Sequence, residues 1–325
     1  AKAWDEFLFK KTIPNKKRLR LLERGLYFYQ RSGMKKLAHA TGVLKLFPEK
    51  LAAFEKVTPK LDKPSKKNER LRVLSPKGEP IYRVAFFTGC IMDTMFAKLN
   101  DLSMKLLQKS GCEVILIDEQ TCCGALQSHH GDREYAKRLA KKNIEAFENV
   151  AADFIVNSIG GCGAMLVEYD KLFKVEEEWF ERAKAFAAKS KDISYVLSKL
   201  ELPFQKEINK VATYQPSCHM TNVQKNVAAP LQLIRSIPGL RFVEQEKADM
   251  CCGSAGIYNL VHYDEAMNIL DVKMKHIKET NPDLIITTNP GCHLQMKLGV
   301  ERGNLQNRVE VVHLVELLAE ACNIE

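Results

Sequence analysis

Several features that would assign a function directly are missing from this sequence. It has no uninterrupted apolar run near the ~20 residues needed to cross a bilayer, and no signal-peptide core opens the chain. It contains neither a glycine-rich phosphate-binding motif nor a His-Glu-x-x-His zinc motif. The first absence predicts a soluble or peripheral protein. The second leaves flavin, nicotinamide and nucleotide binding without support in this chain.

Positive charge is concentrated at the start of the chain. Residues 1–80 hold 21 Lys and Arg against 8 Asp and Glu, a net +13, so the remaining 245 residues carry −4 of the total +9. A basic segment on a mildly acidic body indicates docking to an acidic partner or an anionic membrane surface, although such charge also simply solvates helix faces. No nucleic-acid-binding module accompanies the charge, so nucleic acid is not an expected partner.

Cysteine is abundant, and this abundance indicates a specific role for the thiols. The chain has ten cysteines, and without a secretory signal their expected role is metal binding or catalysis rather than disulfide formation. Eight of them form two copies of the motif Cys-x31/32-Cys-Cys-Gly-x37/38-Cys. The first copy is Cys90, Cys122, Cys123 and Cys162, and the second is Cys218, Cys251, Cys252 and Cys292. Equivalent cysteines are 128 to 130 residues apart, which is the signature of a duplicated unit.

The residues around the cysteines repeat as well. In both copies a short strand rich in Val, Ile or Phe runs into the first cysteine and another precedes the last, while residues 132–150 and 263–279 show helical apolar spacing. The pattern predicts two tandem homologous α/β units with mostly parallel sheets, preceded by a helical N-terminal segment. The cysteines all follow strands, so they are expected to gather at one sheet edge in each unit.

The expected domains follow from this pattern. Residues 1–80 form a basic helical segment that ends in a proline-containing linker, residues 81–210 the first cysteine-rich repeat, and residues 211–325 the second.

Four cysteines per unit match the ligand count of a [4Fe–4S] cluster and of a tetrahedral zinc. Neighbouring side chains diverge, so an adjacent cysteine pair suits a cluster with several metal atoms better than one zinc. Glycines flank the ligands and let the backbone approach a bulky inorganic core. Iron–sulfur is therefore the favoured interpretation, with structural zinc and a dithiol redox centre as alternatives. No residue is expected to be catalytic in the strict sense.

The remaining cysteines and the nearby histidines have different expected roles. Cys112 aligns with a leucine of the second repeat, and Cys322 lies in the last helix without a counterpart, so both are interpreted as structural. Four histidines near the motifs are either solvated loop residues or hydrogen-bond donors, ligands or proton carriers near a cluster. These are His129, His130, His219 and His293.

The motif Cys-Cys-Gly resembles a known family. Residues 122–131, 251–260 and 289–292 are similar to the cysteine-rich CCG-domain family, which includes a component of heterodisulfide reductase, and most similar to its glycolate oxidase iron–sulfur subunits. Those subunits usually begin with a ferredoxin-like domain carrying Cys-x2-Cys motifs, which this chain lacks. The start at Ala1 predicts a longer gene product or processing. The heterodisulfide reductase type has a fifth cysteine per repeat, and none follows Cys162 or Cys292 at that spacing.

The resemblance implies an iron–sulfur electron-transfer subunit of a flavin-dependent oxidoreductase acting on a 2-hydroxy acid such as glycolate or lactate. The implied cofactors are iron–sulfur clusters, [4Fe–4S] in type and one per repeat. The implied partners are a flavoprotein (FAD) subunit, a ferredoxin-like domain or subunit, and a quinone or membrane acceptor. The expected location is the cytoplasm, at the inner face of the membrane. Two alternatives are a disulfide or quinone reductase of heterodisulfide reductase type and a zinc-binding adaptor.

Overall fold

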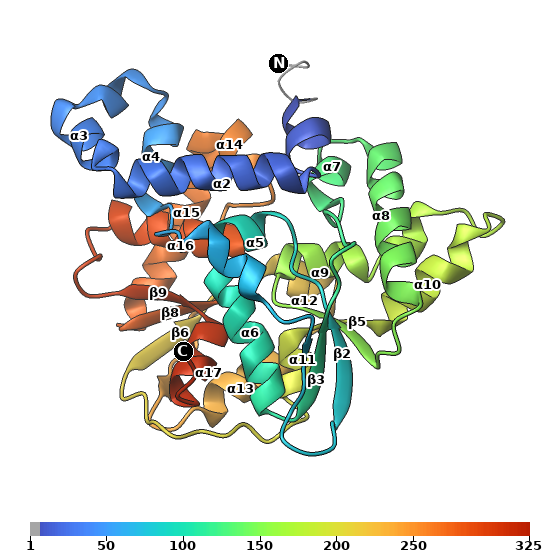
Figure 1. Cartoon of the computed structure of the whole chain (residues 1–325). Coiled ribbons are helices and arrows are strands. Elements are labelled where there is room, and N and C mark those ends of the chain that lie inside the picture. Colours follow the sequence, from blue (N-terminus) through green and yellow to red (C-terminus); the bar gives the residue numbers. More distant parts are fainter. Residues whose placement is uncertain (1–6) are drawn as a thin grey trace.

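The chain alternates strands and helices from residue 73 onward, after an N-terminal segment built from helices alone. The structure is a computed structural model that describes residues 7–325, so the predictions for residues 1–6 lie outside the described residues. The N-terminal helices cross one side of the molecule (Figure 1). They are η1 (Phe7–Thr12), α2 (Lys16–Arg31), α3 (Met34–Thr41), η2 (Val43–Leu46), α4 (Glu49–Val57) and η3 (Pro64–Glu69).

Helix α2 begins where its sequence supplies a cap. The side-chain oxygen of Asn15 accepts the backbone N–H groups of Lys17 and Arg18, at 3.0 and 3.1 Å. These are among the N–H groups that have no partner within a helix, so the cap satisfies them. The cap therefore fixes the start of helix α2 at Lys16.

The first sheet has five strands in the order β1-β3-β2-β4-β5. Strand β1 pairs antiparallel with β3, and the other pairs are parallel. The strands are β1 (Val73–Leu74), β2 (Tyr82–Phe86), β3 (Cys112–Leu116), β4 (Phe154–Asn157) and β5 (Ser190–Asp192). Its helices are α5 (Ile91–Met95), α6 (Ala97–Lys109), α7 (Ala125–His129), α8 (Arg133–Glu148), α9 (Gly160–Leu166), η4 (Tyr169–Leu172), α10 (Trp179–Lys189) and α11 (Ile193–Leu197).

The second sheet repeats this arrangement with four parallel strands in the order β7-β6-β8-β9. Its strands are β6 (Val211–Tyr214), β7 (Arg241–Phe242), β8 (Leu284–Thr287) and β9 (Glu310–His313). Its helices are α12 (Cys218–Asn222), α13 (Ala228–Ser236), α14 (Tyr258–Val261), α15 (Tyr263–Glu279), α16 (Pro290–Arg302) and α17 (Leu314–Ala321). The order matches β3-β2-β4-β5 strand for strand, which is the duplication seen in the cysteine spacing.

The two repeats share one hydrophobic core. A single cluster of buried side chains contains Val84 and Phe86 of β2, Tyr214 of β6 and Ile286 of β8. Helix α17 at the end of the chain packs against α6 of the first repeat. The repeats therefore stabilise each other through buried apolar surface and do not have two separate hydrophobic cores.

The predicted fold class is confirmed: the molecule is mixed α/β with mostly parallel sheets and a helical N-terminal segment. The helices expected over 132–150 and 263–279 are α8 and α15. The outer strands β5 and β9 were not expected, and β1, before residue 81, joins the first sheet. The domain boundaries at residues 80 and 210 stay a prediction. Among the described residues, no helix combines the length and the apolar character that a membrane span requires.

Candidate metal centre

The cysteines of the first motif follow the carboxyl ends of three neighbouring strands. Cys90 comes after β2 and directly precedes α5, and the adjacent Cys122 and Cys123 lie in the loop between β3 and α7. Cys162 lies in the first turn of α9, after β4. Because β3, β2 and β4 are parallel neighbours, these loops open on the same sheet edge.

The structure brings these four thiols together. The Sγ atoms of Cys90 and Cys122 are 3.3 Å apart, and those of Cys123 and Cys162 are 3.2 Å apart. The two pairs are linked because Cys122 and Cys123 are consecutive residues of one loop. Residues separated by up to 72 positions in the sequence therefore meet at one point, as the strand order requires.

The second motif forms an equivalent group. Cys218 is the first residue of α12, after β6, and Cys292 lies in the first turn of α16, after β8. The thiol of Cys251 lies near enough to those of Cys218 and Cys252 to alter their pKa values, and the thiol of Cys252 is similarly near that of Cys292. All eight predicted cysteines thus lie in two groups of four.

The same position in each group favours the thiolate form. Hydrogen bonds from Cys123 and Cys90 hold the pKa of Cys122 well below its usual range, and hydrogen bonds from Cys218 and Cys252 lower the pKa of Cys251 to about 2. Backbone N–H groups on the glycine that follows each pair add to this effect. The same interactions, together with burial, raise the pKa of Cys90 and Cys123 in the first group and of Cys218 and Cys252 in the second. Each group thus has a preferred thiolate, the form of cysteine that binds metals, next to thiols that stay protonated.

Buried polar side chains fix the first cysteine loop. Asn143 of α8 accepts the N–H of Thr121 at 2.8 Å and donates to the carbonyl of Cys122 at 3.0 Å. The hydroxyl of Tyr169 donates to the carbonyl of Cys123 at 2.9 Å. Sequence reasoning missed both residues, because an asparagine within a helix and a tyrosine after one carry no signal of their own. They orient the ligand loop without reaching the thiols.

A buried lysine does the same for the second loop. Lys273 of α15 is fully buried, and its Nζ donates to the carbonyls of Lys247 and Ala248, at 2.9 and 3.0 Å, just before Cys251. Desolvation by this burial lowers the pKa of Lys273 to about 8. The lysine therefore ties the ligand loop to the helix behind it.

Lys273→Met is expected to destabilise the second site. Methionine keeps the apolar stem but removes two partly buried hydrogen bonds from a charged donor, each worth roughly 1.5–3 kcal/mol. Thermal unfolding should show a lower midpoint for this variant than for Lys275→Met, which changes an exposed lysine of the same helix. Equal midpoints for the two variants would show that Lys273 does not hold the loop.

The ligand loops of the two repeats touch each other. The N–H of Gly161, next to Cys162, donates to Oδ1 of Asn289 at 2.9 Å, and the N–H of Gly160 donates to the carbonyl of Thr288 at 3.1 Å. Gly160 is required here, because a Cβ at this position would lie 2.7 Å from Oγ of Ser217. The two cysteine groups therefore face each other across a direct backbone contact.

The histidines near the motifs occupy different environments. His293 is 4% exposed, and its Nδ1 lies 3.1 Å from Oγ1 of Thr287, so it is not a solvated loop residue. Burial holds its pKa well below the usual range. His129 stacks on His219 with ring centroids 5.5 Å apart, which joins one residue from each repeat. His130 stacks on Phe9 of η1.

The two remaining cysteines lie away from the groups of four. Cys112 in β3 and Cys322 after α17 are both buried in the shared core. Desolvation raises the pKa of Cys112 to about 12 and that of Cys322 to about 11. Both thiols are therefore held neutral in apolar surroundings, in agreement with the structural role expected for them.

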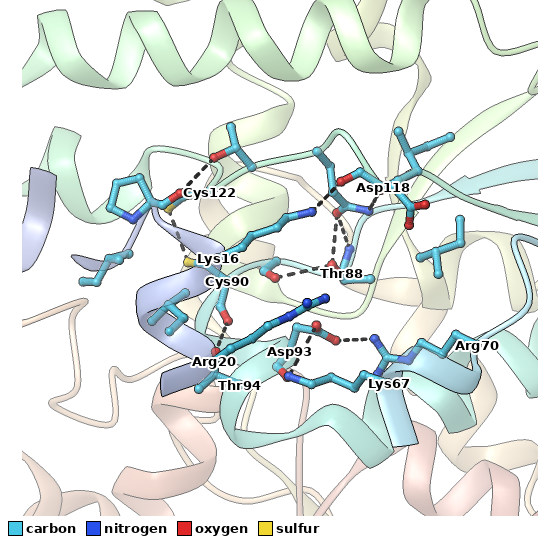
Figure 2. A pocket seen from close by; sticks show the side chains of 18 residues that line it. Lys16, Arg20, Lys67, Arg70, Thr88, Cys90, Asp93, Thr94, Asp118 and Cys122 are labelled. Carbon is cyan, nitrogen blue, oxygen red and sulfur yellow. Dashed lines mark hydrogen bonds and ion pairs between the residues drawn. The ribbon is translucent and has the colours of Figure 1, made fainter. Parts of the chain in front are cut away.

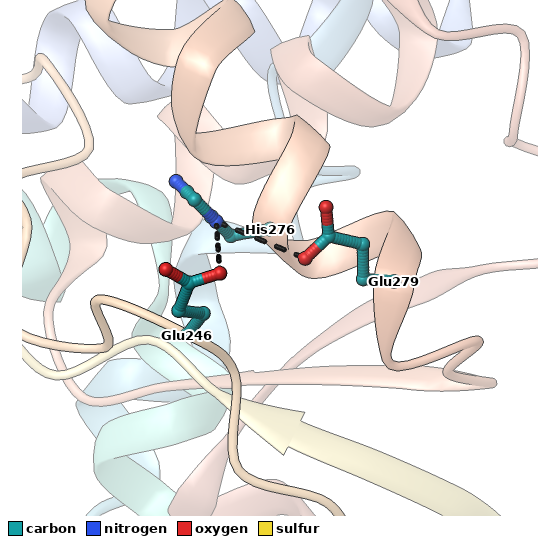
Figure 3. Close-up of side chains that lie close together, drawn as sticks. All are labelled: Glu246, His276 and Glu279. Carbon is teal, nitrogen blue, oxygen red and sulfur yellow. Dashed lines mark ion pairs between the residues drawn. The ribbon is translucent and has the colours of Figure 1, made fainter.

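The arrangement of the sulfurs discriminates between metals. A tetrahedral zinc with Zn–S bonds of about 2.3 Å needs sulfurs about 3.8 Å apart. Among residues 7–325, the one group of three possible ligand atoms all within 4.8 Å of one another is Glu246, His276 and Glu279, and it contains no cysteine (Figure 3). The thiols form linked pairs rather than a compact tetrahedron. This is not the arrangement of four ligands around a single zinc.

Hydrogen-bond donors to sulfur also fit an iron–sulfur core. The N–H of Ala125 lies 3.5 Å from Sγ of Cys123, and the N–H of Gly253 lies 3.4 Å from Sγ of Cys251. Nδ2 of Asn289 lies 3.6 Å from Sγ of Cys292. Such donors stabilise thiolate charge and tune cluster potentials. The residues present therefore fit a cluster in each repeat.

Known protein families match the chain over most of its length. The cysteine-rich CCG domain matches residues 84–167 and 212–297, and the linker region of the glycolate oxidase iron–sulfur subunit matches residues 1–58. A probable glycolate oxidase iron–sulfur subunit from Bacillus subtilis is 47% identical over 316 residues, which cover 96% of this chain and 71% of the relative. Lactate utilization protein A from Halalkalibacterium halodurans and from Geobacillus thermodenitrificans is 32% identical in each case, over 73% of this chain and 96% and 98% of the relatives.

One solved structure shares the fold. A hypothetical protein from Helicobacter pylori superimposes with a TM-score of 0.50 over 84% of this chain and 57% of its own, at 9% sequence identity. At that identity the likeness concerns the fold alone.

Proposed function

This chain belongs to the cysteine-rich CCG-domain family, among its glycolate oxidase iron–sulfur subunits, and from that membership we propose the path its electrons take. A flavoprotein subunit oxidises a 2-hydroxy acid of the glycolate or lactate type, and the electrons cross the two cysteine groups of this chain to a quinone or another membrane acceptor. Each group holds one [4Fe–4S] cluster. A ferredoxin-like domain or subunit completes the route.

One observation carries this proposal: two complete sets of four thiols face each other through touching ligand loops. Iron–sulfur clusters held there supply one-electron transfer at potentials set by burial, charge and hydrogen bonds to sulfur. The chain's own part is to hold the thiolates, donate N–H groups to them and exclude water. The contact of Gly161 with Asn289 keeps the two sets close, which suits a relay.

The thiol count disfavours the heterodisulfide reductase alternative. That type uses a fifth cysteine in each repeat, whereas the residues after Cys162 in α9 and after Cys292 in α16 supply no further thiol. Four thiolates per group leave none to pair with a substrate sulfur. Electron relay is therefore preferred to disulfide reduction at this chain.

The test is anaerobic reconstitution with iron and sulfide, followed by reduction with dithionite and reoxidation with the quinone menadione. We expect an EPR signal that appears on reduction and disappears when the quinone is added. Fewer than about three irons per chain, without a reducible signal, would remove the proposal. A signal that the quinone leaves unchanged would remove the quinone as acceptor and keep the clusters.

We also propose that the N-terminal helices dock on the inner face of the cytoplasmic membrane. Of the eighteen exposed large apolar side chains among the described residues, ten lie within residues 7–57, in the same segment as the basic residues. Helices that combine exposed apolar side chains with Lys and Arg bind the surface of anionic bilayers. The segment thus offers both contributions that peripheral binding needs.

Vesicle sedimentation measures this docking. The chain is expected to bind phosphatidylglycerol vesicles at low salt, and the triple variant Leu21→Ser, Leu37→Ser, Leu46→Ser should bind at least about 10-fold more weakly because apolar area is lost. Val175→Ser is the matched control, since Val175 is 70% exposed outside the segment. Wild-type protein that stays in the supernatant, or equal loss in the control, would contradict membrane docking.

A further inference from the structure

A cavity lies between the N-terminal helices and the first cysteine group. Its volume is about 110 Å³, and its wall includes Cys90 and Cys122 on one side and residues of α2 on the other (Figure 2). A cavity needs about 10–15 Å³ to hold one water, so this one has room for a small molecule of several heavy atoms. It is the place where a solute approaches the first group of thiols.

Two of the four cations in the cavity wall are neutralised by carboxylates. Nζ of Lys67 lies 2.6 Å from Oε2 of Glu23, and Arg70 forms ion pairs of 2.5 Å with both Asp93 and Asp101. These ion pairs form a polar part of the cavity wall. They leave no net positive charge of their own for a ligand.

The other two cations, Lys16 and Arg20, have no carboxylate partner among the described residues. Nζ of Lys16 donates to the main-chain carbonyl of Asp118 at 2.6 Å. Lys16 and Arg20 are both exposed to solvent, so an anion entering the cavity can reach them. The guanidinium of Arg20 extends into the cavity next to Lys16, and no hydrogen bond or ion pair from residues 7–325 holds it there (Figure 2).

The composition of the wall selects the class of anion. A guanidinium binds a carboxylate through two parallel hydrogen bonds, and Lys16 adds a second cationic donor. Asp93 and Asp118 also line the cavity but are paired with Arg70 and Arg72, so the free positive charge comes from Lys16 and Arg20 alone. That charge suits a monoanion better than a dianion such as phosphate. Apolar side chains, among them Ile13, Leu19 and Ile117, suit a short carbon body. A monocarboxylate of two to four carbons satisfies all three conditions.

We propose that this cavity is a binding site for a small monocarboxylate, held by Arg20 and Lys16 against the wall that contains Cys90 and Cys122. Its natural ligand would be the 2-hydroxy acid or 2-oxo acid of the complex, an identification that rests on the proposed function. Carboxylate binding itself does not require the clusters to work. The site shares a wall with Cys90 and Cys122, so it places its ligand beside these thiols.

The test is isothermal titration calorimetry of the anaerobically purified chain at low ionic strength. The probes are glycolate, glyoxylate and lactate, with uncharged glycolamide and inorganic phosphate for comparison. We expect saturable binding of one carboxylate per chain. Arg20→Gln and Lys16→Gln should each weaken it by roughly 10-fold or more, as the loss of a charge-assisted hydrogen bond implies. Arg24→Gln, an arginine of the same helix outside the cavity wall, should leave it unchanged.

Four results would overturn the site. They are no saturable binding of any carboxylate, equal weakening in Arg24→Gln, glycolamide binding as tight as glycolate, and phosphate binding tighter than the carboxylates. Iron and sulfide content, measured on the same preparations, reports separately on the proposed function. A chain that holds clusters without binding carboxylate removes this inference alone, and a chain that binds carboxylate without clusters removes the electron relay alone.

Discussion

Cys122→Ser is expected to remove the iron of the first site, about four of about eight atoms per chain, and to leave the second site loaded. The Sγ of Cys122 lies 3.3 Å from that of Cys90, and Cys122 directly precedes Cys123 in the chain, so it links the two thiol pairs of its group. A serine hydroxyl stays protonated and is a poor replacement for a thiolate. The second group takes all its thiols from residues after 210 and keeps its complete ligand set. Iron analysis and EPR of the reduced protein measure the effect.

The control for this variant is Cys112→Ala. Cys112 is buried in β3 within the shared core, away from both groups, so its removal should leave the iron content unchanged. Loss of all iron from Cys122→Ser would mean that the two repeats share one cluster. Iron loss in the control would assign Cys112 a role that the structure does not give it.

Gly253→Ala is expected to destabilise the protein and to empty the second site. Gly253 directly follows Cys252 and has φ of +89°, a left-handed conformation that costs an L-residue about 1–2 kcal/mol. A Cβ there would also lie 2.6 Å from the carbonyl oxygen of Ala266 in α15. Overpacking of this kind typically costs about 1–3 kcal/mol more. Either the cysteine loop or α15 must shift, which moves Cys251 and Cys252 relative to Cys292.

Gly78→Ala separates the two contributions. Gly78 has the same φ of +89°, but a Cβ there would meet no atom within 4 Å. This variant should show the conformational cost alone and keep its full iron content. Urea unfolding midpoints and iron analysis compare the two variants. Equal destabilisation of both, with iron retained in Gly253→Ala, would show that the close approach to α15 is unimportant.

The position of each cysteine group was predictable because three independent signals agree. Cysteine spacing, glycine spacing and strand spacing recur with nearly the same offset, so β2 corresponds to β6, β4 to β8 and α8 to α15. Once the strands are parallel neighbours, elementary topology places the loops after them together. The outer strand β5 (Ser190–Asp192) was missed because a three-residue polar strand has no apolar periodicity to detect.

The surroundings of the cysteines could not be predicted in the same way. Lys273 lies on a helix whose pattern was clear, but the two carbonyls it reaches belong to a loop about 25 residues earlier. The sequence predicts that the N-terminal segment is basic and helical, but it does not predict what the segment packs against. Phe9 and Ile13 pack in one cluster with Cys122, and Val57 packs in another with Cys252 and Cys292. These contacts arise from tertiary packing. The residues that make them are not separated by a regular number of positions, so no sequence pattern reveals them.

The proposed function requires that the four thiolates of each repeat bind one inorganic cluster. The most direct test is to measure iron, acid-labile sulfide and zinc in anaerobically purified protein, with Mössbauer spectroscopy on the same material. The proposed [4Fe–4S] clusters predict about four irons and about four sulfides per repeat, with every iron in tetrahedral sulfur coordination. One zinc per repeat without sulfide, in colourless protein, would contradict it.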